Sequence, residues 1–278
     1  MTTAIPAVPL NSGTAIPQIG LGTWPMDDAQ VADAIVAAAE AGYRHIDTAA
    51  KYGNEAGVGE GIRRTGLDRS EFFVTTKLNG AAQGDGPAVG ELAKSLDRLG
   101  MDYVDLLLIH WPLPGRDEYV ATWRTFERLH REGRARAIGV SNFKVDHLQR
   151  LVAECEIVPA VNQVQLSPEI TRPAQRAFHA EHGIVTEAYS PLGGSGASSL
   201  DSPVVRAIAE RLGRTPAQVV LRWHVQQGVV AIPRSTDPAR AAANLDVFGF
   251  ELSAADMDEL ATLSQGPDAG NDSDVVGH

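Results

Sequence analysis

Short apolar runs alternate with longer segments of helical period along most of the chain. The runs that favour β-strands cover residues 19–23, 43–48, 72–77, 103–110, 135–141, 160–165, 184–189 and 229–233. The segments with the period of an amphipathic helix cover 27–41, 54–65, 87–99, 118–132, 144–155, 172–182, 202–227 and 237–245. Segment 202–227 is predicted to be two helices, because Thr215 is a good N-cap and Pro216 suits the first helical position.

The strands are expected to be parallel and to close into a barrel. Runs such as VDLLLI and RAIGV are apolar almost throughout, as a strand covered on both faces requires. Eight consecutive strand–helix units without a composition break favour a closed (β/α)8 TIM barrel over an open doubly wound sheet. An open dinucleotide-binding sheet would carry G-x-G-x-x-G, but after Gly20 and Gly22 the third glycine is replaced by Pro25. We therefore predict the α/β class and a single (β/α)8 barrel.

The two ends of the chain flank this barrel. The stretch AVPLNSGTAIPQ predicts a β-hairpin that turns near Asn11, Ser12 and Gly13, so residues 1–18 are assigned to an N-terminal hairpin. Residues 264–278 have little core-forming character and are assigned to a C-terminal tail. No Gly-, Ser- or Pro-rich linker divides the chain, and residues 1–278 are expected to form one domain.

Composition narrows the class of protein. The 278 residues are 44% hydrophobic and 21% charged, the balance of a globular protein with a sizeable core. The formal net charge of −11 argues against nucleic acid or an anionic membrane as a partner. Cys155 is the only cysteine, which excludes an intrachain disulfide. With no leader-like N-terminus and no membrane-length apolar run, these features predict a cytoplasmic protein.

Polar side chains gather at the carboxyl ends of the predicted strands. They are Asp47, Lys77, His110, Ser141, Asn142, Gln163, Tyr189, Ser190, Arg234 and Ser235. Each alone has an ordinary explanation, such as a solvated lysine, a hydrogen-bonded structural histidine or a packed tyrosine. In a parallel barrel, however, all these strand ends open onto one face, the face that carries the chemistry of such barrels.

Seven stretches, in order, resemble those of the aldo-keto reductase superfamily. They are GYRHIDTAAKYGNE, FFVTTKL, DLLLIHWP, AIGVSNF, VNQVQ, AYSPLG and VVAIPRS, and the resemblance runs from about residue 19 to about residue 252. The whole pattern is similar to the prokaryotic 2,5-diketo-gluconic acid reductase branch. The resemblance implies the barrel, NADPH as cofactor, a monomer, and a catalytic tetrad of Asp47, Tyr52, Lys77 and His110.

These four residue types suit the reduction of aldehydes and ketones, such as small dicarbonyls and keto sugars. Reduction needs a hydride at carbon, from the nicotinamide, and a proton at oxygen. A buried ammonium lowers the pKa of a neighbouring phenol, so Tyr52 is the predicted general acid, with Lys77 as the cation and Asp47 holding it. His110 is predicted to orient and polarise the carbonyl. The alternative makes His110 the acid, since histidine titrates nearest neutral pH.

The resemblance also implies a set of cofactor-binding residues. They are Ser141, Asn142, Gln163, Tyr189, Ser190, Leu192, Gly193, Arg234, Ser235, Thr236, Arg240 and Asn244. The first three would bind the carboxamide, Tyr189 would stack on the nicotinamide, and the loop to Gly193 would follow the pyrophosphate. Arg234 and Arg240, at a helix N-terminus, would bind the 2′-phosphate, and Asn244 would reach the adenine. Because acidic Asp237 stands beside them, we expect NADPH to be preferred and NADH to be accepted weakly.

The substrate mouth is expected to be aromatic, with Trp24, Tyr52, His110 and Trp111 around it. Two other classes of protein remain as alternatives. An NADPH-binding barrel with a sensing or structural role would share the fold, although the intact tetrad argues against it. A metal-dependent barrel hydrolase would need ligands such as His45, but no His-x-His spacing is present, and no metal site is predicted.

Overall fold

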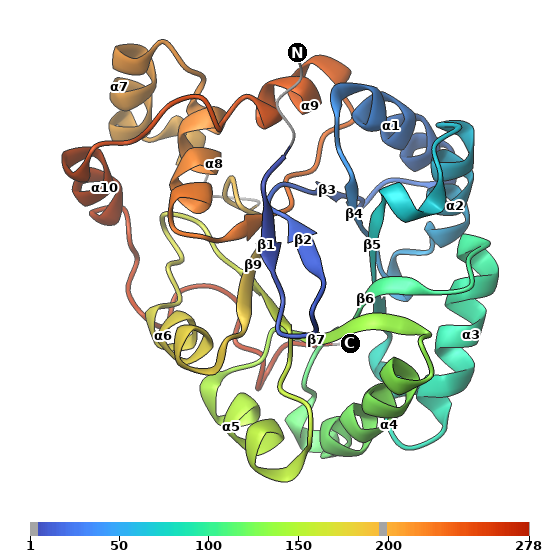
Figure 1. The fold of residues 1–278 in the computed structure, drawn as a ribbon. Coiled ribbons are helices and arrows are strands. Elements are labelled where there is room, and N and C mark those ends of the chain that lie inside the picture. The colour runs from blue at the N-terminus through green and yellow to red at the C-terminus, as the bar shows by residue number, and fades with distance from the viewer. Residues whose placement is uncertain (1–4, 195–198, 278) are drawn as a thin grey trace.

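The computed structural model describes residues 5–194 and 199–277, and its centre is one eight-stranded parallel sheet (Figure 1). Neighbouring strands follow one another in chain order. They are β3 (Leu21–Gly22), β4 (His45–Asp47), β5 (Phe73–Leu78), β6 (Val104–Ile109), β7 (Ala135–Ser141), β8 (Val161–Gln165), β9 (Val185–Tyr189) and β10 (Val230–Ala231). β5 and β6 are buried at every position. For β6 this agrees with the almost continuous apolar run VDLLLI, whereas β5 also buries Thr75, Thr76 and Lys77.

The sheet closes on itself between its first and last strands. Ile19 forms a parallel bridge with Ala231, the Gly20 amide donates to the Ala231 carbonyl at 2.9 Å, and the Gly22 amide donates to the Pro233 carbonyl at 3.2 Å. These bonds confirm the predicted (β/α)8 barrel. β3 and β10 are shorter than the runs 19–23 and 229–233, because only two residues of each keep strand pairing along the sheet.

Helices cover the outside of the barrel. They are α1 (Asp28–Ala41), α2 (Glu55–Arg64), α3 (Pro87–Leu99), α4 (Tyr119–Arg131), α5 (Val145–Glu154), α6 (Pro173–His182), α7 (Pro203–Leu212), α8 (Pro216–Gln226), α9 (Pro238–Leu245) and α10 (Ala254–Ala261). Segment 202–227 is two helices, as predicted, and the Thr215 hydroxyl caps α8 by accepting from the Gln218 amide at 3.2 Å. No helix in the described ranges is long and apolar enough to cross a membrane.

Helix α10 has no counterpart among the predicted elements. Its signal is present in the sequence as a capping box, in which the Ser253 hydroxyl accepts from the Asp256 amide and the Asp256 carboxylate accepts from the Ser253 amide. The helix is short, and Leu260 is its only fully buried apolar residue, so the hydrophobic period is weak.

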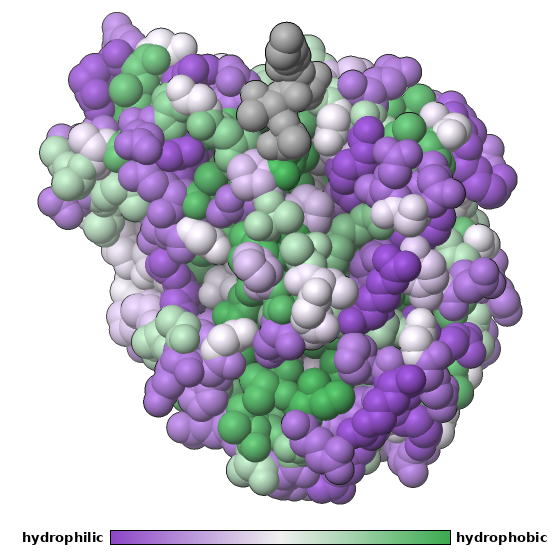
Figure 2. Space-filling model, viewed as in Figure 1, coloured by the Kyte–Doolittle hydropathy of each residue, from purple (hydrophilic) through white to green (hydrophobic). Residues whose placement is uncertain are grey.

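The predicted hairpin is present and closes the amino-terminal end of the barrel. β1 (Ala7–Pro9) pairs antiparallel with β2 (Ala15–Pro17), and Ile16 packs into the barrel interior against Leu106 and Val161. Figure 1 looks onto this end with the hairpin in front, and Figure 2 shows hydrophobic residues around and below it within a hydrophilic rim. The carboxyl ends of the strands therefore open at the opposite end, away from the hairpin.

Glycines on α2 allow this helix to approach its neighbours closely. A Cβ on Gly57 would lie 2.3 Å from the Asp28 carbonyl oxygen, and one on Gly59 would lie 2.1 Å from the Leu99 carbonyl oxygen. Both obstacles are backbone atoms that no side-chain rotation can move. The three glycines of GVGEG are thus packing residues and not a phosphate-binding loop.

Gly59→Ala is expected to lower the free energy of unfolding by about 1–3 kcal/mol, because the added methyl must displace the end of α3. Gly90→Ala on α3 is the matched control: a Cβ there meets nothing within 4 Å, so alanine should stabilise that helix by about 0.5–1 kcal/mol. Chemical denaturation of both variants measures the difference. Equal stability of the two variants would contradict the packing role of Gly59.

Candidate active site

Three of the four predicted tetrad side chains are joined by short polar contacts. Asp47 ends β4 and Lys77 lies near the end of β5, and both are almost fully buried. The Lys77 Nζ donates to Asp47 Oδ1 at 2.5 Å, to the Thr48 carbonyl at 3.0 Å and to the Tyr52 hydroxyl at 3.3 Å. The ammonium therefore lies between a carboxylate and a phenol, the arrangement that the family resemblance implies for these three residues.

Tyr52 is held in place by a hydrogen-bonded turn that follows β4. It ends the short 3-10 helix Ala50–Tyr52, which is followed by Gly53 with a φ of 71°. The Asn54 side chain fixes the far side of the turn: it accepts from the Thr48 hydroxyl at 2.8 Å and donates to the Met26 carbonyl at 2.9 Å. Asn54 is fully buried, so these bonds anchor the loop that presents the phenol.

Aromatic rings surround the phenol. The Tyr52 ring lies 5.3 Å from that of Trp24 and 5.7 Å from that of His110, and His110 stacks at 6.4 Å on Trp111. Trp24 is 58% exposed, whereas His110 and Trp111 are buried. The four residues predicted for the substrate mouth thus lie together, with one ring facing solvent and the others forming a wall.

The electrostatics of the phenol differ from the expectation in one respect. Lys77 does favour the phenolate, but burial opposes it more strongly, so the pKa of Tyr52 is raised and not lowered. The pKa of Lys77 is also raised: burial would lower it, but the Asp47 carboxylate and the Tyr52 phenol together outweigh that effect. Tyr52 is therefore protonated at neutral pH, which is the form that an acid needs.

Of the residues predicted to bind the carboxamide, Ser141 and Gln163 lie on β7 and β8, and Asn142 directly follows β7. The Asn142 side chain donates to the His110 carbonyl at 3.0 Å and accepts from the Tyr189 hydroxyl at 2.8 Å. Asn142 has a φ of 64°, a left-handed conformation that asparagine tolerates well. The Ser141 hydroxyl donates to the Gln163 carbonyl at 2.9 Å. These four residues and His110 form one hydrogen-bonded group at the carboxyl ends of the strands.

The loop after β9 turns sharply beside Tyr189. Ser190 has a φ of 49° and Gly193 a φ of 93°, and the Gly193 amide donates to the Ser190 carbonyl at 3.1 Å. The ring of His224, on α8, fixes the loop through a contact of 3.0 Å with the Pro191 carbonyl. Leu192 is half-buried against the core. The predicted pyrophosphate loop is therefore a well-anchored turn.

The N-terminus of α9 departs from the prediction. The Asp237 carboxylate accepts from the amides of Ala239 and Arg240, so it occupies the helix donors that were expected to bind an anion. Asp237 also lies 3.6 Å from the Arg240 guanidinium, and its amide is bonded to the Ser235 hydroxyl. Asp237 is thus the N-cap of α9, and a phosphate would have to compete with it.

The other residues predicted to bind the adenosine end of the cofactor lie around α9. Arg234 and Thr236 are exposed. Asn244 is buried beside the Tyr43 hydroxyl, and its hydrogen bond partly offsets the burial that raises the pKa of Tyr43. Arg234 therefore offers an accessible guanidinium, while the side chain of Asn244 is already engaged with its neighbour.

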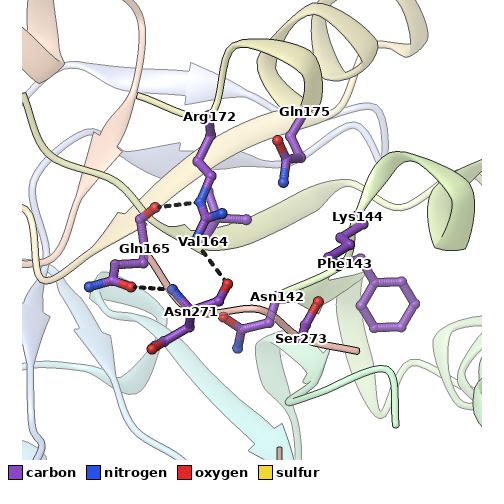
Figure 3. A pocket seen from close by; sticks show the side chains of 9 residues that line it. All are labelled: Asn142, Phe143, Lys144, Val164, Gln165, Arg172, Gln175, Asn271 and Ser273. Atoms are coloured by element: carbon purple, nitrogen blue, oxygen red, sulfur yellow. Dashed lines mark hydrogen bonds between the residues drawn. The ribbon is translucent and has the colours of Figure 1, made fainter. Parts of the chain in front are cut away.

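A small pocket beside Asn142 was not predicted (Figure 3). Its lining residues are Asn142, Phe143, Lys144, Val164, Gln165, Arg172, Gln175, Asn271 and Ser273. The Arg172 guanidinium donates to the carbonyls of Gln165 and Asn271, and the Gln165 side chain accepts from the Asn271 amide at 3.0 Å. The Asn271 side chain also donates to the Tyr189 hydroxyl at 3.2 Å. The predicted tail thus reaches the active-site end of the barrel.

Charge complementarity holds the tail there. The Lys144 ammonium lies 2.5 Å from the carboxylates of both Asp272 and Asp274, and His147 lies 3.1 Å from Asp274. The only sequence signal was the acidic character of DAGNDSD, which by itself does not identify its partner. Within the described residues, no group of three or more His, Cys, Asp or Glu side chains is arranged to hold a metal ion.

Comparisons with known proteins agree with this geometry. The sequence profile of the Aldo/keto reductase family matches residues 18–265, and the chain belongs to this family of oxidoreductases. It is 48% identical over 267 residues to an aldo-keto reductase of Mycolicibacterium smegmatis, covering 96% of each protein. It is 43% identical over 271 residues to the methylglyoxal reductase DkgA of Escherichia coli, covering 97% of this chain and 98% of DkgA.

Solved structures extend the similarity to three dimensions. The crystal structure of a mutant of Gox0644 in complex with NADPH has a TM-score of 0.94 and 40% sequence identity, and it covers 99% of this chain and 100% of that one. The similarity to DkgA places the chain in the branch that resembles 2,5-diketo-gluconic acid reductase. Both parts of the family prediction are therefore confirmed.

Proposed function

We propose that the protein reduces aldehydes and ketones with NADPH, using Tyr52 as the general acid. The observation that carries this proposal is the position of the Lys77 ammonium, 2.5 Å from the Asp47 carboxylate and 3.3 Å from the Tyr52 hydroxyl. This group lies at the strand ends of a barrel, under a partly exposed aromatic wall that includes Trp24. Family membership supports the same class of reaction.

The residues present fit a nicotinamide cofactor. Tyr189 ends β9, and Ser190 begins the left-handed turn whose backbone would hold the pyrophosphate. Asn142 and Gln163 supply amide groups within the same hydrogen-bonded group. Exposed Arg234 supplies a cation at the far end. The binding of NADPH by the Gox0644 mutant supports the assignment. When bound, the cofactor supplies the hydride.

The chain's own residues supply the proton and the orientation. His110, whose ring lies 5.7 Å from that of Tyr52, directs the carbonyl oxygen toward the phenol by donating a hydrogen bond. Tyr52 then donates its proton to that oxygen, and the phenolate that forms is stabilised by the Lys77 ammonium. Asp47 keeps the ammonium in place during this change of charge. The buried ring of Trp111 excludes water from its side of the reacting carbonyl.

The aromatic lining of the mouth suits small carbonyl compounds, and we propose small dicarbonyls and keto sugars as substrates. An aromatic wall with few charges would accept uncharged, compact molecules, and the name of the relative DkgA, a methylglyoxal reductase, supports this class. We further propose that the protein works as a monomer with one barrel domain, in a reducing compartment such as the cytoplasm, without nucleic acid as a partner. The net charge of −11 supports the absence of a nucleic-acid partner, and the single cysteine supports a reducing compartment. The monomer rests on the family resemblance alone.

The test compares kcat/KM for NADPH and NADH in the reduction of methylglyoxal. NADPH is expected to be preferred, with weak NADH activity because Asp237 caps α9. Arg234→Gln should lower kcat/KM for NADPH by about tenfold or more and leave the value for NADH nearly unchanged, since only NADPH carries the 2′-phosphate. Arg63→Gln, an exposed arginine on α2, is the control. NADPH binding without any carbonyl reduction would indicate a sensing or structural barrel instead.

A further inference from the structure

A buried acid with no role in the proposed reaction lies next to the tetrad, inside the barrel. Glu187, on β9, is fully buried in the barrel interior. The Gln163 side-chain nitrogen donates both to Glu187 Oε2 at 2.8 Å and to Asp47 Oδ2 at 2.7 Å. Asp47 in turn holds Lys77. One amide group therefore connects the buried acid to the carboxylate that positions the catalytic ammonium.

The other oxygen of Glu187 faces a histidine. His45 Nε2 lies 3.5 Å from Glu187 Oε1, and within the described residues no hydrogen bond reaches this oxygen. His45 Nδ1 lies 3.3 Å from the Pro17 carbonyl, which can only accept, so the proton of a neutral His45 is on Nδ1. Nε2 then presents its lone pair both to the Thr75 hydroxyl, 3.3 Å away, and to Glu187 Oε1. Two acceptors facing each other are unfavourable unless one of them carries a proton.

The environment decides which of the two holds that proton. Burial lowers the pKa of His45 to about 3, so its ring is neutral at physiological pH. Burial, together with the Asp47 carboxylate, raises the pKa of Glu187 to about 8. Facing Glu187 are His45 and Asp47 from β4, Lys77 from β5 and Gln163 from β8, while its partner in the β10 register is apolar Val230. The proton therefore belongs to Glu187.

We propose that Glu187 is a positioning residue for the reduction, a protonated carboxyl that bridges His45 and Gln163 and whose ionisation weakens Tyr52 as an acid. The inference rests on the proposed function. As a neutral acid, Glu187 keeps its proton, donates a hydrogen bond to His45 Nε2 and leaves Gln163 Nε2 bonded to both acidic side chains. This arrangement fixes the orientation of the Gln163 amide, since only its nitrogen can bond two acceptors, and leaves Oε1 to accept from another donor.

The sign of the pH effect follows from charge. As the pH rises through about 8, Glu187 loses its proton and adds a negative charge close to Asp47. That charge raises the pKa of Tyr52 further, because it disfavours the phenolate. A phenol with a higher pKa is a weaker acid, so the turnover number for reduction falls on the alkaline side. Lys77 stays protonated throughout this range, since its pKa is raised.

Glu187→Gln removes the ionisation and keeps the size of the side chain. We expect the ratio of kcat for this variant to kcat for the parent to rise by about threefold or more between about pH 6.5 and about pH 9.5, with NADPH and methylglyoxal saturating. Glu187→Met, which also lacks the acid, should share the flatter profile. Glu251→Gln, on an exposed loop, is the matched control and should keep a constant ratio. Superimposable profiles for the parent and Glu187→Gln would overturn the proposal.

A second readout does not depend on activity. The pKa of Glu187 is higher in the folded protein than in the unfolded chain, so the folded state binds the extra proton between about pH 4.5 and about pH 8. The stability of the parent should fall across this range relative to that of Glu187→Gln, and the difference in Tm should level off above it. A constant difference in Tm overturns the proposal. If the parent reduces no carbonyl compound, the proposed function fails, while the unfolding measurement still tests Glu187.

Discussion

Tyr52→Phe is expected to lower kcat for carbonyl reduction by about 10²–10⁴-fold while leaving the Kd for NADPH nearly unchanged, because general acid catalysis contributes a factor of this size. The substitution removes only the hydroxyl, which lies 3.3 Å from the Lys77 Nζ. The ring keeps its contacts with Trp24 and His110, so the wall of the site stays in place. Steady-state kinetics give kcat, and quenching of tryptophan fluorescence by NADPH gives Kd.

The matched control is His110→Gln, which tests the alternative acid. If His110 were the proton donor, this variant would lose as much turnover as Tyr52→Phe, and the tyrosine variant would stay within a factor of a few of the parent. If His110 orients the carbonyl, its loss should also raise KM, because the ground-state complex loses a hydrogen bond as well. A tyrosine variant with nearly full activity would make the assignment of the acid wrong.

Lys77→Met is expected to reduce both activity and stability. Among the described residues, removal of the ammonium leaves the buried Asp47 carboxylate with the Gln163 amide as its one side-chain hydrogen-bond donor. Breaking a buried pair in this way costs about 3–5 kcal/mol. Turnover should fall at least as far as in Tyr52→Phe, because the phenolate that forms during the reaction loses its cation. Urea denaturation measures the stability loss, and the same kinetic assay measures turnover.

The double variant Asp47→Asn with Lys77→Met separates these two effects. With both charges removed, most of the lost stability should return, because no unpaired charge remains in the interior. Turnover should stay low, because the cation is still missing. If the double variant regains activity together with stability, the ammonium acts only as a structural partner, and the electrostatic role proposed for Lys77 is wrong.

The architecture was largely predictable because the barrel leaves strong local signals. The run VDLLLI becomes β6 at Val104–Ile109, and the predicted helix 27–41 is Asp28–Ala41, bounded by the Asp27 N-cap and by Gly42 in a left-handed conformation. The ends of β3 and β10 were not predictable, since they depend on where strand pairing stops along the sheet. α10 was missed because its apolar period is weak.

The site was predictable only as far as it follows from strand ends and family motifs. Asp47, Tyr52 and Lys77 come together as expected. The direction in which the pKa of Tyr52 shifts could not be predicted from the sequence. Burial and the Lys77 charge act in opposite directions, and their balance depends on the folded surroundings. Glu187 was missed because its partners come from strands far apart in sequence, and in the sequence it is one acid in an otherwise apolar strand.

The strands that lead to the site differ in length around the barrel. β3 and β10 have two residues each, whereas β5 and β6, which carry Lys77 and lead to His110, have six. Trp24 and Arg234 follow the two short strands. Exchange or lengthening of these two loops could therefore redirect substrate and cofactor choice during evolution, while the proton-transfer geometry stays anchored in the best-paired strands.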